Sequence, residues 1–307
     1  MTEIRLPPIK TNKDGATRKA GFELEYAGLT LPQTAEIVAS LFGGNIIEES
    51  RSSIRVEQTQ FGAFTIMLDM QMMQKLSSEV ADELKQNPQN ETVKAWAERL
   101  LHPLVSTWIP NEIVTPPLPL DDLSQMNRLA TALREAGAKG THASSFYAFG
   151  MHINPELPGI EPAHLHDYLC AFVLLQERLQ VQGDMDITRQ LSRFAKLFPE
   201  SYAEHILQPD YRPDIDRLID DYLLFNPTRN RALDMLPAFS MFDEDKVRRA
   251  VPDALVRKRP TFHYRLPNCD IDNPDWSPLD EWNLWLTVEE LAENKERLQT
   301  MKVAYTA

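Results

Sequence analysis

The hexapeptide GFELEY at residues 21–26 sets the pattern from which the rest of the chain can be interpreted. Its aromatic and aliphatic side chains alternate with Glu23 and Glu25. Successive side chains of a strand point to opposite faces of its sheet. The stretch therefore predicts a strand with one apolar face and one face that carries two carboxylates.

Three further segments repeat this pattern. His152 and Asn154 flank an isoleucine, and His263 and Arg265 flank a tyrosine. Glu112 lies in NEIVTPP, where the paired prolines are expected to end a strand. If these strands belong to one sheet, its polar face gathers carboxylates, imidazoles and a guanidinium, and its apolar face packs on helices.

Helical and strand-like segments alternate along the rest of the chain. The helix at 31–42 is expected to begin after Thr30 and to end at two glycines, and the helix ending at Gly137 is expected to be capped by Asp121 or Asp122. Strands are expected at 21–26, 45–58, 61–69, 108–117, 146–154 and 260–267, and helices at 31–42, 71–86, 91–102, 121–137, 162–182 and 281–299.

These elements predict an α+β fold with a mainly antiparallel sheet assembled from distant segments and with helices on its outer face. Residues 1–18 are expected to be a flexible lead-in, and residues 19–307 a single catalytic domain. A mostly helical insert is expected at about 160–258. His164 and His166, near the start of this insert, are expected to be solvated.

Composition excludes several classes of protein. The chain has 307 residues, with 32 Lys+Arg against 45 Asp+Glu, a formal charge of −13 that argues against nucleic-acid binding. No run of 18 apolar residues predicts a membrane span, and the two cysteines and the absence of a secretion signal lead us to expect a cytoplasmic protein. No P-loop, GxGxxG or GxSxG motif is present.

The polar strand faces have two interpretations. Antiparallel sheets often expose one polar face to water, which would explain any single pair. Paired carboxylates on one face repel each other, however, so a cation is a natural partner, and carboxylates with imidazole suit Mg²⁺ or Mn²⁺. Such ions usually bind the phosphates of a substrate, and the guanidinium of Arg265 would also bind phosphate oxygens.

The four segments GFELEY, NEIVTPPL, FGMHINP and TFHYRLPNCDID, in this order, resemble those of the amidoligase family, which is related to glutamine synthetase and glutamate–cysteine ligase. The resemblance covers about residues 18–297. It implies a curved antiparallel sheet of the glutamine synthetase type, forming a trough. It also implies ATP-dependent amide-bond formation through an acyl phosphate, with Mg²⁺ or Mn²⁺.

The resemblance also implies roles for individual residues. The metal ligands would be Glu23, Glu25, Glu112, His152 and His263, the nucleotide would contact His152, Asn154, Arg229 and Arg231, and the catalytic residues would be Glu25, Arg265 and Asp69. Independently of the resemblance, the amine must lose a proton, so a nearby carboxylate is expected to accept it, and Asp69 and Glu57 are the two candidates. His263 stands where the family usually has Glu, so one metal site would carry less negative charge.

The substrates implied are a carboxylate and an amine, small molecules or peptides, among them amino acids and polyamines. Pairing with a glutamine amidotransferase-type enzyme is also implied. Two alternatives stay open at this point: a metal-dependent hydrolase that needs no ATP, and a family member that binds nucleotide but has lost catalysis through His263.

Overall fold

Strand β1 (Lys19–Tyr26) lies inside an antiparallel sheet, between β5 and β7. The computed structural model describes residues 3–69, 85, 89, 110–141, 149–183 and 195–306. In these ranges nine strands form one sheet in the order β2-β3-β4-β5-β1-β7-β9-β8, with β6 paired to β1. The other strands are β2 (Asn45–Ser50), β3 (Ser53–Thr59), β4 (Gly62–Leu68), β5 (Asn111–Val114), β6 (Leu118–Pro119), β7 (Met151–Pro155), β8 (Leu233–Asp234) and β9 (His263–Tyr264).

The apolar face of this sheet forms the main core. Residues from five neighbouring strands are fully or almost fully buried on it: Phe22 and Leu24, Val56, Ile66, Ile113, and Ile153. Burial of such side chains contributes about 1.5–3 kcal/mol each. The alternation in GFELEY therefore fixes which face of β1 turns inward, and its glutamates must lie on the other face.

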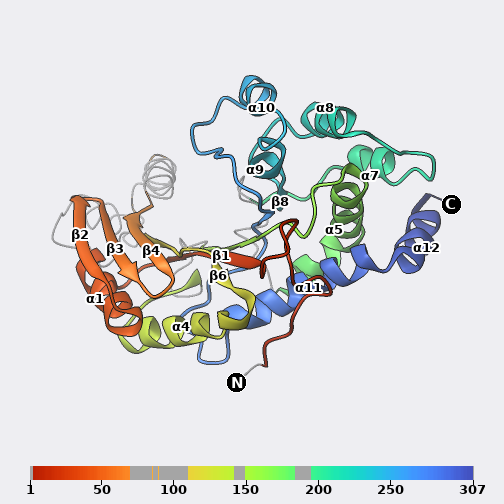
Figure 1. The fold of residues 1–307 in the computed structure, drawn as a ribbon. Coiled ribbons are helices and arrows are strands. Elements are labelled where there is room, and N and C mark those ends of the chain that lie inside the picture. Colours follow the sequence, from red (N-terminus) through yellow and green to blue (C-terminus); the bar gives the residue numbers. More distant parts are fainter. Residues whose placement is uncertain are drawn as a thin grey trace.

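Helices α1 (Leu31–Phe42), α4 (Gln125–Glu135) and α11 (Pro278–Glu293) lie along one side of the sheet (Figure 1). Helix α1 begins at the predicted cap, because the Thr30 side chain accepts from the Gln33 amide, and it ends at Gly43 with φ of 75°. The remaining helices are α5 (Pro162–Gln182), α7 (Glu200–Ile206), α8 (Ile215–Phe225), α9 (Leu236–Phe239), α10 (Glu244–Ala250) and α12 (Lys295–Thr306).

Several predicted boundaries are wrong. Residues 45–58 form a hairpin of two strands, and the last helix divides at Asn294 into α11 and α12. Asp121 and Asp122 lie in a short 3-10 turn (Leu120–Asp122), and α4 starts later. The segment at 260–267 contributes only the two residues of β9, and the predicted insert also supplies β8 to the sheet. The helices predicted at 71–86 and 91–102 fall outside the described residues.

The segment predicted as a lead-in contacts the body of the protein. Arg18 is fully buried and forms a bidentate ion pair with Glu289 of α11, at 2.8 and 2.9 Å. The Trp282 indole donates to the backbone carbonyl of Arg5. The division into lead-in, domain and insert stays a prediction. None of the helices in the described ranges is long and apolar enough to cross a membrane.

Candidate metal centre

The strand register brings the predicted polar residues together on one face of the sheet. Glu25 of β1 lies opposite Glu112 of β5, and Glu23 lies opposite His152 of β7. The next strand, β9, starts at His263 and pairs with β7. Side chains that come from positions more than 200 residues apart are therefore neighbours, because they share the face that cannot pack on helices.

Glu23 is the centre of this cluster and is 9% exposed. Its carboxylate lies 2.9 Å from Nδ1 of His152 and accepts a hydrogen bond of 3.0 Å from the amide of Asn154. Burial raises the pKa of Glu23, but the His263 ring, the hydrogen bond from His152 and the Arg259 charge together hold that pKa well below its ordinary value. Glu23 is thus an ionised carboxylate inside the protein.

His263 presents a second nitrogen to the same carboxylate. Its Nε2 is buried, lies 3.7 Å from Glu23 Oε2, and has no hydrogen-bond partner among the described residues. Burial and the neighbouring Arg265 charge hold the pKa of His263 well below its ordinary value, although the Glu23 carboxylate opposes this. The rings of His152 and His263 meet edge to face at 5.1 Å.

Ligand atoms of Glu23, His152 and His263 all lie within 4.8 Å of one another. An ionised carboxylate and neutral imidazoles are groups that bind divalent metal ions. The residues present therefore fit a divalent cation.

A second group of acids extends from this centre across β1 and β5. Glu25 Oε1 lies 3.8 Å from Nε2 of His152, and Glu25 Oε2 accepts from the Gly150 amide. Burial and the charges of Glu23, Glu25 and Asp69 raise the pKa of Glu112 well above its ordinary value. We call Glu23, Glu25, Glu112 and Asp69 the carboxylate side of the cluster.

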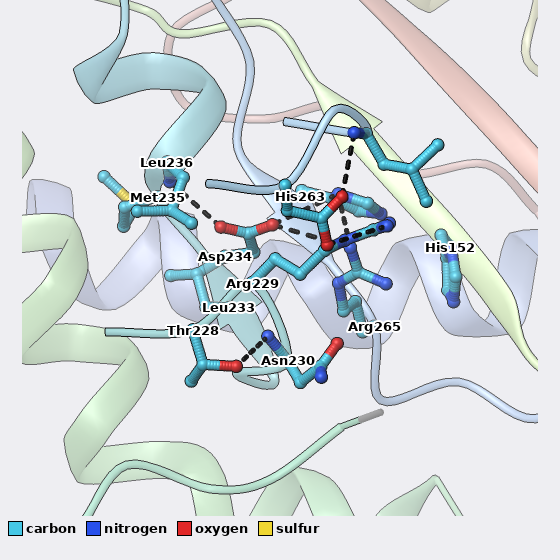
Figure 2. Close-up of polar contacts among 12 residues, drawn as sticks. His152, Thr228, Arg229, Asn230, Leu233, Asp234, Met235, Leu236, His263 and Arg265 are labelled. Atoms are coloured by element: carbon cyan, nitrogen blue, oxygen red, sulfur yellow. Dashed lines mark hydrogen bonds and ion pairs between the residues drawn. The ribbon is translucent and has the colours of Figure 1, made fainter. Parts of the chain in front are cut away.

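The opposite side of the cluster carries three arginines and one acid, and we call Arg229, Arg259, Arg265 and Asp234 the guanidinium side. Asp234 is 2% exposed and accepts a 3.0 Å hydrogen bond from the Leu236 amide. Nη2 of Arg265 lies 3.5 Å from Asp234 and 3.2 Å from Nδ1 of His263. Figure 2 shows Asp234, His263 and Arg265 converging, with Arg229 beside them.

The sequence did not single out Asp234 or Arg259. Asp234 occupies β8 directly opposite His263, and burial raises the pKa of its carboxyl group although Arg265 opposes this. Arg259 precedes β9 and donates to Asn154 Oδ1 at 2.9 Å. Both lie in segments without regular alternation. The charge of Asp234 among apolar neighbours could have indicated it, whereas Arg259 directly follows the basic residues Arg257 and Lys258.

The structure separates the two arginines that were predicted as a pair. Arg229 reaches the cluster: burial and the nearby Arg265 charge lower its pKa, and its Nη1 lies 3.8 Å from Oδ2 of Asp253. Arg231 turns away and donates to the backbone carbonyls of Leu197 and Phe225. Glu57 also lies apart, on β3, where it pairs with Arg55 at 3.1 Å.

Comparison with protein-family models matches residues 16–287 to a family described as "putative amidoligase enzyme". Comparison with curated proteins and with solved structures found no match. The family match includes all the strands of the sheet and every residue of the carboxylate and guanidinium sides. Its description indicates a ligase that forms amide bonds. This chain belongs to that amidoligase family.

Proposed function

We propose that the protein is an ATP-dependent ligase that joins a carboxylate to an amine through an acyl phosphate. The observation that carries the proposal is the division of one polar face into a carboxylate side and a guanidinium side that meet at His152 and His263. Phosphoryl transfer needs cationic groups on both sides of the transferred phosphate, and little covalent chemistry from the protein. The antiparallel sheet with one polar face also supports the glutamine synthetase-like fold.

In the proposed reaction, a substrate carboxylate oxygen attacks the γ-phosphorus of ATP, and the bond to ADP breaks. The amine then attacks the acyl carbon, and phosphate leaves. A Mg²⁺ or Mn²⁺ ion, when bound at Glu23, His152 and His263 with Glu25 and Glu112 beside them, supplies positive charge to the phosphate oxygens.

The guanidinium side would hold the phosphates from the other direction. Arg265 and Arg229 carry donors suited to phosphoryl oxygens, and Asn154 links Arg259 to Glu23. Arg231 has no part in this proposal because its donors bind backbone carbonyls.

The amine must lose a proton, and the carboxylate side offers the acceptor. Asp69 follows β4 and is one of the charges that raise the pKa of Glu112. A carboxyl group with a raised pKa is a stronger base than an ordinary one, so Glu112 joins Asp69 as a candidate. The amine of an amino acid, a peptide or a polyamine would suit this proton acceptor.

The proposal is tested by measuring ADP release over a panel of amino acids, peptides and polyamines with Mg²⁺ or Mn²⁺. We expect release that requires an acid and an amine together, and a decrease of about a hundredfold or more in Glu25→Gln. Glu48→Gln, which changes an exposed glutamate of β2 in the same sheet, is the matched control. Full activity of Glu25→Gln would reject the role of Glu25.

One observation favours a second candidate, a metal-dependent hydrolase. Two imidazoles and one carboxylate form the ligand set of several catalytic zinc sites, in which a bound water is the nucleophile. Such an enzyme would turn over without ATP. Calorimetry that shows metal binding but no nucleotide binding would favour the hydrolase over the ligase.

A further inference from the structure

Arg259 stands at the border between the carboxylate side and the guanidinium side. Its Nη2 donates to Asn154 Oδ1 at 2.9 Å, lies 3.3 Å from His263 Nδ1, and lies 3.7 Å from Glu23 Oε1. One guanidinium edge thus contacts two candidate metal ligands and the amide that orients one of them.

The rest of this guanidinium is open to a further ligand. The Arg259 side chain is 34% exposed, and its buried Nε has no hydrogen-bond partner among the described residues. Arginine has five N–H donors, and the contacts above use only the Nη2 group. The residue therefore has donors left for an oxyanion beside the candidate metal centre.

The position of Arg259 opposes cation binding. Its fixed positive charge lies next to Glu23, the carboxylate around which the candidate ligands gather. Two cations at one carboxylate repel each other, and the repulsion is strong where burial limits screening by water. An oxyanion that binds Arg259 would offset this charge and remove the repulsion.

We propose that Arg259 couples the metal centre to an anion site, so that a phosphate-type oxyanion and a divalent cation each strengthen the binding of the other. The proposal rests on the metal centre of the proposed function. Because the coupling is a free energy between two sites, it acts equally in both directions. It would favour ATP together with its metal over either one alone.

The test is calorimetric titration with Mn²⁺ in chloride and in sulfate at matched ionic strength. Sulfate is the probe because it is a tetrahedral dianion. In wild-type protein we expect sulfate to lower the Mn²⁺ dissociation constant about tenfold, a typical coupling between sites. In Arg259→Gln we expect binding about tenfold tighter than wild type in chloride, and a sulfate effect of about twofold or less.

Two variants separate charge from structure. Arg259→Lys keeps the charge and is expected to resemble wild type in chloride, whereas Arg257→Gln removes an exposed neighbouring charge and is expected to change neither value. The backbone amide of Arg259 donates a hydrogen bond to the Pro237 carbonyl. Neither Arg259→Gln nor Arg259→Lys removes this backbone bond.

The outcomes distinguish two failures. If Mn²⁺ binds wild-type protein but Arg259→Gln binds it more weakly, or keeps the full sulfate effect, Arg259 only supports the cluster and the coupling is wrong. If wild-type protein binds no Mn²⁺ in either salt, the metal centre itself is wrong, and the coupling falls with it.

Discussion

The carboxylate side and the guanidinium side are built in different ways. The carboxylate side lies on or directly after strands of four to eight residues, and β1, β4 and β5 are each paired to strands on both sides. The guanidinium side rests on β8 and β9, of two residues each, and on irregular segments around Arg229 and Arg259.

The two sides also differ in how their charges are balanced. Asp234 lies among the three arginines as a compensating acid. On the carboxylate side the acids raise the pKa of Glu112. The guanidinium side therefore contains its own compensating acid, whereas the carboxylate side has an excess of negative charge that an added cation would offset. Removal of an acid should therefore lower the free energy of unfolding on the guanidinium side and raise it on the carboxylate side.

The largest effect is expected for Asp234→Asn. The change removes a buried negative charge that lies 3.5 Å from Arg265, so the free energy of unfolding should fall by about 3 kcal/mol. Urea unfolding measures this value. Asp253→Asn removes a more exposed partner of Arg229 and should cost less than about 1 kcal/mol. Equal losses in the two variants would show that the guanidinium side is not held by Asp234.

A smaller effect is expected for His263→Glu at the border of the two sides. The change adds a negative charge beside Glu23, so the Mn²⁺ dissociation constant should fall about tenfold. An unchanged constant would place His263 outside the metal centre. ADP release by His263→Glu but not by wild-type protein would instead support the alternative in which this protein binds nucleotide and has lost catalysis through His263.

Glu112→Gln should act in the opposite sense to Asp234→Asn. In metal-free protein the change relieves repulsion and should raise the free energy of unfolding by about 1 kcal/mol at about pH 8. The pKa of Glu112 is higher in the folded protein than in the unfolded chain. The contribution of Glu112 to the free energy of unfolding is therefore most favourable below its pKa in the unfolded chain, and it is lost as pH rises through its pKa in the folded protein. The gain should therefore shrink on acidification, as urea unfolding at several pH values would show. A loss of stability would contradict the comparison.

The carboxylate side could be predicted from the sequence because alternation in a long strand fixes the face of each side chain. Glu23, Glu25 and Glu112 lie as predicted, and so do His152 and His263. Strand β8, of two residues, provides no such alternation around Asp234.

The positions of Asp234 and Arg259 could not be predicted, because they depend on how the insert returns to the sheet. Arg231 shows the same limit, since its side chain turns to backbone carbonyls. His166, expected in solvent, is 3% exposed, because it contacts Ile206 in the insert. The local sequence pattern does not predict which distant helices pack against each other.

The most direct test of the account is Mn²⁺ binding to metal-free wild-type protein and to Glu23→Gln, measured by calorimetry with Glu57→Gln as the control. The account predicts that wild-type protein and Glu57→Gln bind Mn²⁺ alike, and that Glu23→Gln binds it about a hundredfold more weakly or not at all. Equal affinity of all three proteins, or no binding to wild-type protein, would contradict the metal centre on which the account rests.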